Sequence, residues 1–541
     1  MANKDRLAVV LSRNYSTGLS VIRSLGTAGY TVDLVASAPR EGASAFIAKS
    51  RFVREASESV TKKVKDQDDS GLVRSLLDYE GKWPEKPVLI AADDYTASVM
   101  DKHKDELKDI FIMPEIVGGE PGSLTHMMDK SVQGAIARKV GIKTPKEWVV
   151  SLRDETPVIP PEMIYPCYVK PLGSTVGYKQ EMARCDNEDE LVAHLLKLRE
   201  YYADRSVLVQ EFMFIDEEYD LEGVCMDQEI ILPGIIWKKI VAQYDKGVPL
   251  YGKLFPKELF GDFMEKVYAF LREFHYFGMF DLGFNKIGDE YYFNELNLRS
   301  GGTNYVYFES GANLSEIFLK AALKEPITEE ETQVKEFEKI YLYEKVAWDD
   351  YFHKYLTKEQ LNECTETADI HIMVNDYDPE PGDIFMEEVT AEDKRLRTKE
   401  LRNNALAAAM AETGWDRDHA KEELKATREL TGTTYKDYVA FKLWNFPREE
   451  QEEAYQKAFK KRERLKKQRE EAIAYSMDIM GWSEEEAKAQ IKDARARLGI
   501  SYKDYKKYRF CLVPLEEQEA EYEKILIAKA KEKEQKEQKE Q

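Results

Sequence analysis

The stretch Asn294-Glu295-Leu296-Asn297-Leu298-Arg299-Ser300-Gly301-Gly302 decides how the rest of the chain is interpreted. Glu295 and Asn297 are two residues apart, so on a β-strand both side chains project from the same face. Carboxylate and amide oxygens are hard ligands that suit Mg2+. Arg299 follows at the strand end, and the two glycines after it allow backbone to approach a ligand closely. The stretch therefore predicts a strand that ends at a site for a cation and an anion.

A second strand before this stretch completes a predicted hairpin. The segments 278–284 and 291–297 predict two neighbouring strands. Aromatic and leucine side chains surround the polar ones on the second strand, and these side chains favour burial. A charged strand end on the surface would not need them, so the polar residues are expected to line a site.

Two lysines upstream are candidates for binding phosphate. Met128-Asp129-Lys130 starts a predicted helix over 131–140. A predicted strand over 165–170 ends in Lys170 and continues into the loop 171–177, which has two glycines and two hydroxyls. An ammonium group and backbone N–H groups arranged in this way can surround a polyphosphate. For Lys170 alone, a surface lysine before a glycine-rich turn is an equally good interpretation.

The first 124 residues alternate between strands and helices. Apolar runs at 7–11, 31–36 and 87–91 predict strands, and helical segments separate them. This alternation predicts an open α/β domain with a parallel sheet. The turn over 12–18 lacks the GxGxxG pattern, so we expect a structural turn there and no dinucleotide site.

These elements, in this order, resemble the ATP-grasp superfamily of carboxylate-amine ligases, over nearly all of residues 1 to about 385. Three motifs are most similar to the D-aspartate ligase-like group within that superfamily: Ser50 to Phe52, Ala91 to Asp94, and Asn297 to Gly302. The order of the elements supports the resemblance more than any single motif does.

The resemblance implies a mixed α/β fold class. It places an N-terminal parallel α/β domain at 1–124 and an α+β ATP-grasp domain, with the nucleotide and metal site, at 125–325. We expect residues 326–390 to close this body, because their few strands cannot form a core alone.

The resemblance also implies an ATP site in the second domain. The residues that it assigns to the nucleotide are Lys130, Lys170, Gly173, Ser174, Gly177, Gln210, Glu211, Met213 and Glu218. The two lysines would contact the phosphates, and the loop with the glycines would form a lid over them. The strand end from Gln210 to Phe214 would meet the adenine through its backbone, and Glu218 would bind the ribose hydroxyls.

A Mg2+ site follows from the same resemblance, with Mn2+ as the alternative ion. Glu295 and Asn297 correspond to the metal ligands of the superfamily, and Arg299 to the residue that steadies an acyl phosphate. Arg299 and Lys170 are therefore the expected catalytic residues.

Gly283 departs from the pattern of the superfamily, because many members carry a Glu or Asp metal ligand at this position. The nearest carboxylate is Asp281, two residues earlier on the same strand face and about 7 Å away along the strand. Three alternatives follow. Asp281 reaches the metal through a shift or a water, Glu295 alone bridges two ions, or catalysis is impaired.

The activity implied is ATP-dependent ligation. The γ-phosphoryl group of ATP would pass to the carboxylate of an amino acid such as aspartate, and an amine would attack the resulting acyl phosphate. ADP and phosphate would be released, and the amine could belong to a peptidoglycan precursor. Two alternatives remain: a catalytically impaired nucleotide-binding scaffold that acts through its C-terminal helices, and a ligase that makes free dipeptides or amides.

The C-terminal region contains an internal repeat with a period of 67 residues. Residues 414–457 and 481–524 share 18 identities in 44 aligned positions without a gap, and chance would give about three. We expect two helical units, 400–457 and 467–524, that dock a protein partner or mediate self-association. The Lys/Glu/Gln-rich end, 525–541, is expected to be disordered.

Charge differs between the two regions of this 541-residue chain. The net charge is −22 in total, −24 over residues 1–390 and +2 over 391–541. An acidic body argues against broad contact with nucleic acid. The sequence has no apolar run long enough for a transmembrane segment and no signal-like start, which predicts a cytoplasmic location. Five scattered cysteines without CxxC spacing predict buried thiols.

Overall fold

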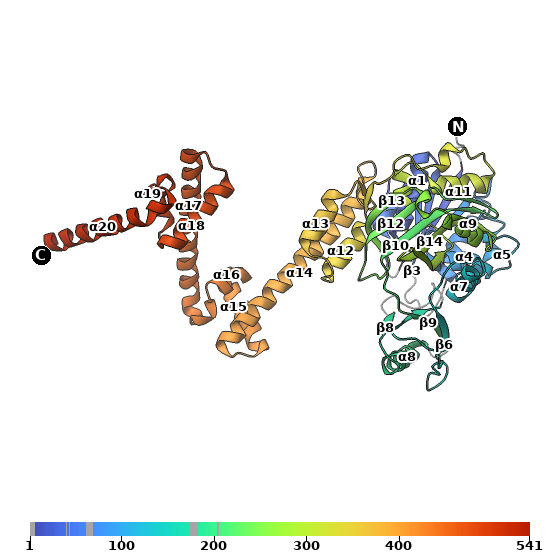
Figure 1. Ribbon diagram of the computed structural model, residues 1–541, viewed down its shortest axis with the longest axis horizontal. Coiled ribbons are helices and arrows are strands. Elements are labelled where there is room, and N and C mark those ends of the chain that lie inside the picture. The colour runs from blue at the N-terminus through green and yellow to red at the C-terminus, as the bar shows by residue number, and fades with distance from the viewer. Residues whose placement is uncertain are drawn as a thin grey trace. The chain divides into compact units, whose positions relative to one another are not determined.

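The computed structural model describes residues 6–13, 15–38, 41–42, 44–60, 69–172, 182–202 and 205–540 (Figure 1). The chain forms two compact units, Met1–Asp393 and Lys394–Gln541. Within the ranges just given, no helix combines the length and the apolar character that crossing a membrane requires.

The N-terminal sheet is parallel, as predicted. Its strands lie in the order β3-β2-β1-β4, with the bounds β1 Leu7–Ser12, β2 Thr31–Ala38, β3 Val53–Val60 and β4 Val88–Ala91. The surrounding helices are α1 Tyr15–Ala28, α2 Ala45–Ala48, α3 Ser70–Leu77, α4 Asp94–Lys102 and α5 Lys104–Leu107. Strands β1 and β4 are buried along their whole length, as expected for a parallel sheet covered on both faces.

A nine-stranded sheet forms the centre of the first unit. Seven strands run in the order β15-β14-β10-β12-β13-β16-β17, while β5 pairs with β14 and β11 pairs with β10. Their bounds are β5 Glu115–Ile116, β10 Glu217–Met226, β11 Glu229–Ile231, β12 Ile235–Val241, β13 Pro249–Phe255, β14 Tyr276–Ile287, β15 Glu290–Asn297, β16 Ile340–Leu342 and β17 Ile370–His371. The last two strands come from the segment 326–390, which therefore extends the main sheet and does not fold separately.

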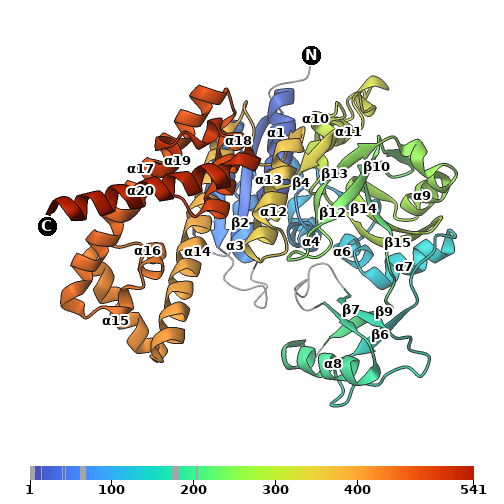
Figure 2. The same cartoon turned by 60° about the vertical axis from the view of Figure 1, so that its left-hand side comes forward.

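A small antiparallel sheet forms a lobe of its own, which Figure 2 shows beside the labels β6, β7 and β9. Its order is β6-β9-β7-β8, with the bounds β6 Glu147–Ser151, β7 Cys167–Pro171, β8 Ala183–Cys185 and β9 Ser206–Glu211. Helix α8, Glu188–Tyr202, covers one face through buried leucines.

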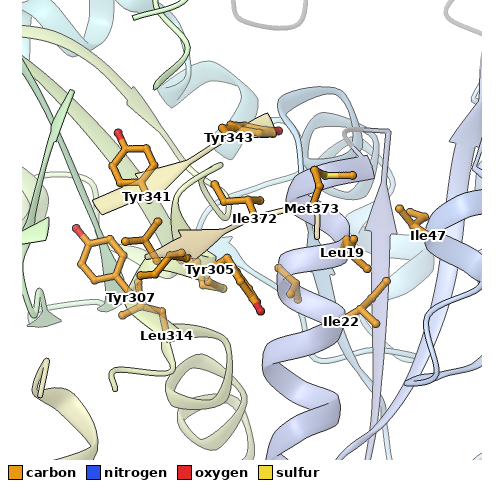
Figure 3. Packing of buried hydrophobic residues seen from close by; sticks show 14 of the residues in the cluster. Leu19, Ile22, Ile47, Tyr305, Tyr307, Leu314, Tyr341, Tyr343, Ile372 and Met373 are labelled. Atoms are coloured by element: carbon orange, nitrogen blue, oxygen red, sulfur yellow. The ribbon is translucent and has the colours of Figure 1, made fainter. Parts of the chain in front are cut away.

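The remaining helices of the first unit cover the large sheet or connect its strands. They are α6 Ser123–Met127, α7 Lys130–Lys139, α9 Phe263–Arg272, α10 Asn304–Glu309, α11 Leu314–Leu323, α12 Glu344–Phe352 and α13 Lys358–Thr367, with 3-10 turns at Lys257–Phe260 and Glu330–Thr332. Figure 3 shows Leu19 and Ile22 of α1 packed near Tyr305 and Met373. One apolar core thus joins the N-terminal sheet to the large sheet.

Arg23 ties these parts together through a buried ion pair. Its side chain is fully buried, its Nε donates to Asp378 Oδ2 at 2.9 Å, and its other nitrogens donate to the carbonyls of residues 372, 373 and 378. Asp378 also accepts hydrogen bonds from the Ser50 hydroxyl and the Arg51 amide, both at 2.9 Å. A single carboxylate therefore links α1, the start of β3 and the segment after β17.

The C-terminal unit is wholly helical, as predicted. Helix α14, Pro379–Thr413, contains the boundary between the units, and the other helices are α15 Arg417–Thr431, α16 Tyr435–Ala440, α17 Gln451–Met480, α18 Glu484–Leu498, α19 Tyr502–Lys507 and α20 Gln518–Glu540. Short 3-10 turns lie at Leu443–Asn445, Arg448–Glu450, Phe510–Leu512 and Leu515–Glu517.

The charged end of the chain differs from the disordered segment that its composition predicts. Helix α20 runs to Glu540, so the backbone of 525–540 is helical. Ala, Lys, Glu and Gln are strong helix formers, and Glu and Lys four residues apart attract each other along one helix face. Low hydrophobicity was the wrong criterion here, because a helix can continue without burying apolar surface.

Replacing Asp378 by Ala should lower the free energy of unfolding of the chain by about 3 to 5 kcal/mol, because it leaves the buried Arg23 charge without its partner. Urea-induced unfolding measures the change. The matched control is Asp376→Ala, at an exposed carboxylate two residues away, which should leave stability nearly unchanged. Equal stability of the two variants would contradict the role assigned to the ion pair.

Candidate functional site

A cavity of about 600 Å3 lies where the large sheet meets the small one. Eight of the predicted site residues line it: Lys130, Lys170, Glu211, Met213, Glu218, Glu295, Asn297 and Arg299. They come from α7, β7, β9, β10 and β15, which are distant in the sequence. The tertiary structure therefore brings most of the predicted site together.

Two described residues of the predicted site, Gln210 and Asp281, are not among the side chains that line this cavity. Gly173, Ser174 and Gly177 lie outside the described residues. Gln210 is buried beside the cavity, and its amide donates to Glu147 Oε2 at 3.1 Å. Asp281 lies behind Arg299, to which it is hydrogen-bonded.

The hairpin of β14 and β15 has the predicted arrangement. Asp281 pairs with Asn297 and Gly283 with Glu295, so the side chains of Glu295 and Asn297 share one face of the sheet. The register shifts after Gly283, because Phe284 pairs with Phe293. This irregularity adds local twist beside the site, which is where β-bulges often occur.

Arg299 connects three elements at the floor of the cavity. Its Nε donates to Asp94 Oδ1 at 3.0 Å, at the start of α4, and its Nη1 donates to Asp281 Oδ2 at 2.9 Å, on β14. Burial acts to lower the pKa of Arg299, but the two carboxylates outweigh it and raise the pKa above its ordinary value. The Asn297 Nδ2 atom donates to the same Asp281 oxygen at 3.2 Å, which leaves Asn297 Oδ1 on the other side of the amide.

Two lysines make the opposite side of the cavity positive. Lys130 Nζ lies 2.9 Å from Glu295 Oε2, and α7 begins at this lysine because the Asp129 carboxylate accepts the amide hydrogens of Ser131 and Val132. Burial and the nearby charge of Lys130 lower the pKa of Lys170 to about 8. A site that depresses a lysine pKa in this way favours an anion.

The backbone amides of the last residue of β9 and of the residue after it already donate hydrogen bonds within the protein. The Glu211 amide donates to Lys146 O and the Phe212 amide donates to Pro166 O, both at 2.9 Å. The Arg184 guanidinium lies over the Phe212 ring, 4.5 Å from its centroid. Arg184 and Phe212 both line the cavity. Phe212 lies in the segment predicted to meet the adenine through its backbone, whereas Arg184 was not predicted from the sequence.

Asp220 is the most informative residue that the sequence analysis missed, and Lys238 is its buried partner. Asp220 pairs with Gly283 across β10 and β14, and its Oδ1 lies 3.3 Å from the place where a Cβ on Gly283 would stand. Lys238 Nζ is 2.7 Å from Asp220 Oδ1 and 3.8 Å from Glu218. Burial raises the pKa of Asp220 to about 7, although Lys238 opposes this change. The signal for this cluster was the alternation of acidic residues along β10, which places Glu218 and Asp220 on one face.

Gly301 was predicted to let the backbone approach a ligand closely, but the structure gives a different reason for the glycine. A Cβ there would lie 2.3 Å from the buried carboxyl group of Glu222, whose oxygens accept the amide hydrogens of Gly301 and Thr303 at 3.0 and 2.9 Å. The missing side chain at Gly301 thus makes room for Glu222 and not for a ligand. Burial, and next the Asp281 charge, raise the pKa of Glu222 to about 8.

Among the described residues, no group of three or more His, Cys, Asp or Glu side chains is placed to hold a metal ion. Among the oxygens that line the cavity, the Glu295 carboxylate and Asn297 Oδ1 lie on the same face of β15. This donor set fits Mg2+, which binds through one or two protein oxygens and keeps several waters when it arrives with nucleotide phosphates.

The chain is similar in sequence to a D-aspartate ligase of Enterococcus faecium (strain Aus0004), with 22% identity over 256 residues. The resemblance to the ATP-grasp carboxylate-amine ligases is confirmed. The aligned region is 42% of this chain and 57% of that ligase, so the chain spans little more than half the length of this curated relative. No protein-family model matches the chain.

Solved ATP-grasp structures resemble the chain at low identity. The L-amino acid ligase from Bacillus licheniformis has 13% identity and a TM-score of 0.46, over 61% of this chain and 78% of its own. The biotin carboxylase domain of Hydrogenobacter thermophilus 2-oxoglutarate carboxylase, crystallised with MgADP, has 16% identity and a TM-score of 0.48, over 62% and 73%.

Lys170 should react with a limiting amount of acetic anhydride at pH 8 much faster than exposed Lys436 does, because about half of Lys170 is then the neutral amine and an ordinary lysine is almost fully charged. Peptide mass spectrometry measures both rates in one sample. Removing the neighbouring charge with Lys130→Met should raise the pKa of Lys170 and slow its reaction. Equal rates for Lys170 and Lys436 in the unaltered protein would show that the Lys170 pKa is not depressed.

Proposed function

We propose that this protein is an ATP-dependent ligase that phosphorylates a carboxylate and couples it to an amine. The observation that supports this proposal is the meeting of Lys130, Lys170, Glu295, Asn297 and Arg299 in one cavity. The sequence similarity to a ligase makes the scaffold alternative the weaker one.

The two lysines are suited to hold the phosphates of ATP. Lys130 and Lys170 come from different lobes, α7 and β7, and only Lys130 has a carboxylate within 3 Å among the described contacts. Their mutual repulsion is relieved when anionic oxygens lie between them. When bound, Mg2+ would neutralise charge on the transferring phosphoryl group. Glu295 and Asn297 are the residues that would hold it.

The reaction follows from these positions. A carboxylate oxygen of the donor attacks the γ-phosphorus, the bond to the β-phosphate oxygen breaks, and ADP leaves with that electron pair. The amine then attacks the acyl carbon, the bond from that carbon to the phosphate oxygen breaks, and the amine loses a proton. Arg299 lies at the floor of the cavity, where its guanidinium can orient the acyl phosphate. Exclusion of water matters at this stage, since water would hydrolyse the acyl phosphate.

An amino acid is the donor that we propose, with aspartate as the first choice, because the curated relative is named a D-aspartate ligase. The acceptor is an amine, either on a larger precursor such as that of peptidoglycan or on a free amino acid. Lys246 is a further cation at the cavity wall, from the turn between β12 and β13, and it could pair with a second carboxylate of the donor.

Asp281 serves this site, we propose, by positioning its neighbours and not by ligating the metal. Both Arg299 and Asn297 donate to its Oδ2 atom, so this carboxylate holds the Asn297 amide with Oδ1 turned away from it. At the position of Gly283, many superfamily members carry a metal-binding carboxylate. In this chain the neighbouring side chain there is Asp220, which is paired with Lys238. Glu295, Asn297 and water would then be the ligands of the ion.

ADP release with ATP and Mg2+, measured against a panel of D- and L-amino acids with and without small amines, should depend on one acidic amino acid. Glu295→Gln should reduce this release at least a thousandfold, because it removes the charged metal ligand. Lys436→Gln, far from the cavity in sequence and outside its lining, is the matched control and should retain full activity. Silence across the panel, with ATP binding demonstrated by thermal shift, would contradict the choice of donor.

Mn2+ binding in the presence of ADP, measured by electron paramagnetic resonance, should separate the roles of the two carboxylates. Glu295→Gln should abolish binding, and Asp281→Asn should weaken it only about tenfold, as expected for a residue that orients a ligand. Loss of binding of equal size in both variants would show that Asp281 is itself a ligand.

A further inference from the structure

A groove of about 450 Å3 lies within the C-terminal unit, between the second half of α14 and α15, with α16 at one end. Four cationic side chains, one tyrosine, the Glu429 carboxylate and an apolar floor line it. The cations are Arg402, Lys421, Lys425 and Arg428, the ring is Tyr435, and the floor is Leu406 with Leu424. Figure 1 shows α15 and α16 beside this part of α14.

One cation of the groove is held in place by its surroundings. The Arg428 guanidinium lies over the Tyr435 ring, 4.0 Å from the centroid, and its Nε donates to Thr433 O at 3.1 Å. Stacking on an aromatic ring fixes the plane of the guanidinium and does not neutralise its charge. The groove therefore has a preorganised positive wall beside an apolar floor.

The same set of residues recurs 67 positions later. Helices α17, α18 and α19 carry Arg469, Lys488, Lys492, Arg495 and Tyr502, with Ile473 and Ile491 at the floor positions. Arg495 lies over Tyr502 at 3.7 Å, and its Nε donates to Ile500 O at 3.1 Å. The chain thus carries the same cations and the same ring a second time, and the second stacked pair has the geometry of the first.

Positive charge is kept selectively between the segment 394–430 and its repeat 461–497. From 394–430 to 461–497, eight basic residues are identical: Lys394, Arg395, Arg397, Lys399, Arg402, Lys421, Lys425 and Arg428. No acidic residue is identical over the same span, and Glu429 at the groove becomes Ala496. Charges that serve only to solvate a helix need not keep their sign at a given position. Four of the eight line the first groove, where retention of the positive sign together with the shape of the groove favours an anionic ligand.

We propose that each groove binds an acidic peptide segment of a partner protein. Carboxylates of the segment would pair with the lysines and arginines, and an aliphatic side chain between them would cover the leucine or isoleucine floor. A nucleic acid fits less well, because the unit Lys394–Gln541 has 34 basic and 30 acidic residues and the Glu429 carboxylate lines the first groove. Two grooves on one chain would strengthen binding to a partner that carries two such segments.

Random 12-residue peptides displayed on phage and selected on the full-length protein should yield sequences rich in Asp and Glu around an aliphatic residue. The fluorescein-labelled form of the most enriched peptide then serves as the probe in fluorescence anisotropy. Changing all four of Arg402, Lys425, Arg469 and Lys492 to Glu should weaken peptide binding at least a hundredfold. Changing only the first pair or only the second pair, which alters one groove, should weaken it less.

The matched control reverses Lys436 and Lys503, a basic pair that both copies also retain but that lies outside the groove lining, and it should leave affinity unchanged. Circular dichroism confirms that each variant keeps its helices. The proposal would be overturned if the selected peptides showed no excess of Asp and Glu. It would also be overturned if the variant with all four groove residues reversed bound the peptide as tightly as the unaltered protein. A 20-residue oligothymidine that binds as tightly, through the same four residues, would overturn it in favour of nucleic acid. None of these measurements depends on ligase activity, so their outcome is independent of the proposed function.

Discussion

The ion pairs of Arg299 with Asp94 and Asp281 are the constraint on which the rest of the site depends. A buried guanidinium is stable only where carboxylates compensate for its lost hydration, and removing one partner of such a pair is strongly destabilising. This requirement fixes the start of α4 against the end of β15 and holds β14 between them. Because Asp281 also accepts from Asn297, the direction of the proposed metal-binding amide follows from the same pairs.

Around this cluster the N-terminal sheet, the large sheet and the closing segment 326–390 form one compact unit. The parallel sheet and the large antiparallel sheet share an apolar core, and the buried Arg23–Asp378 pair crosses between them. The small sheet contributes Lys170 to the opposite wall of the cavity. Burial, and next the charge of Lys130, lower the pKa of Lys170, and an anionic substrate would supply compensating negative charge.

We propose that the two units bind different anionic ligands. In the acidic first unit, Lys130, Lys170 and Arg299 line one cavity, where we propose that phosphates bind. The second unit spreads positive charge along repeated grooves, where we propose that a protein segment binds. A partner held there would raise the effective concentration of an acceptor that it carries, without any change at the catalytic site.

The sequence by itself determined the features that depend on spacing within one element. The period of two placed Glu295 and Asn297 on one face of β15, the Asp129 cap started α7 at Lys130, and the alternation of strands and helices predicted the parallel sheet. Only the tertiary structure decided which residues face each other across elements. Asp220 beside Gly283, and Glu222 in the space left by Gly301, depend on strand register and chain topology, which no local period encodes.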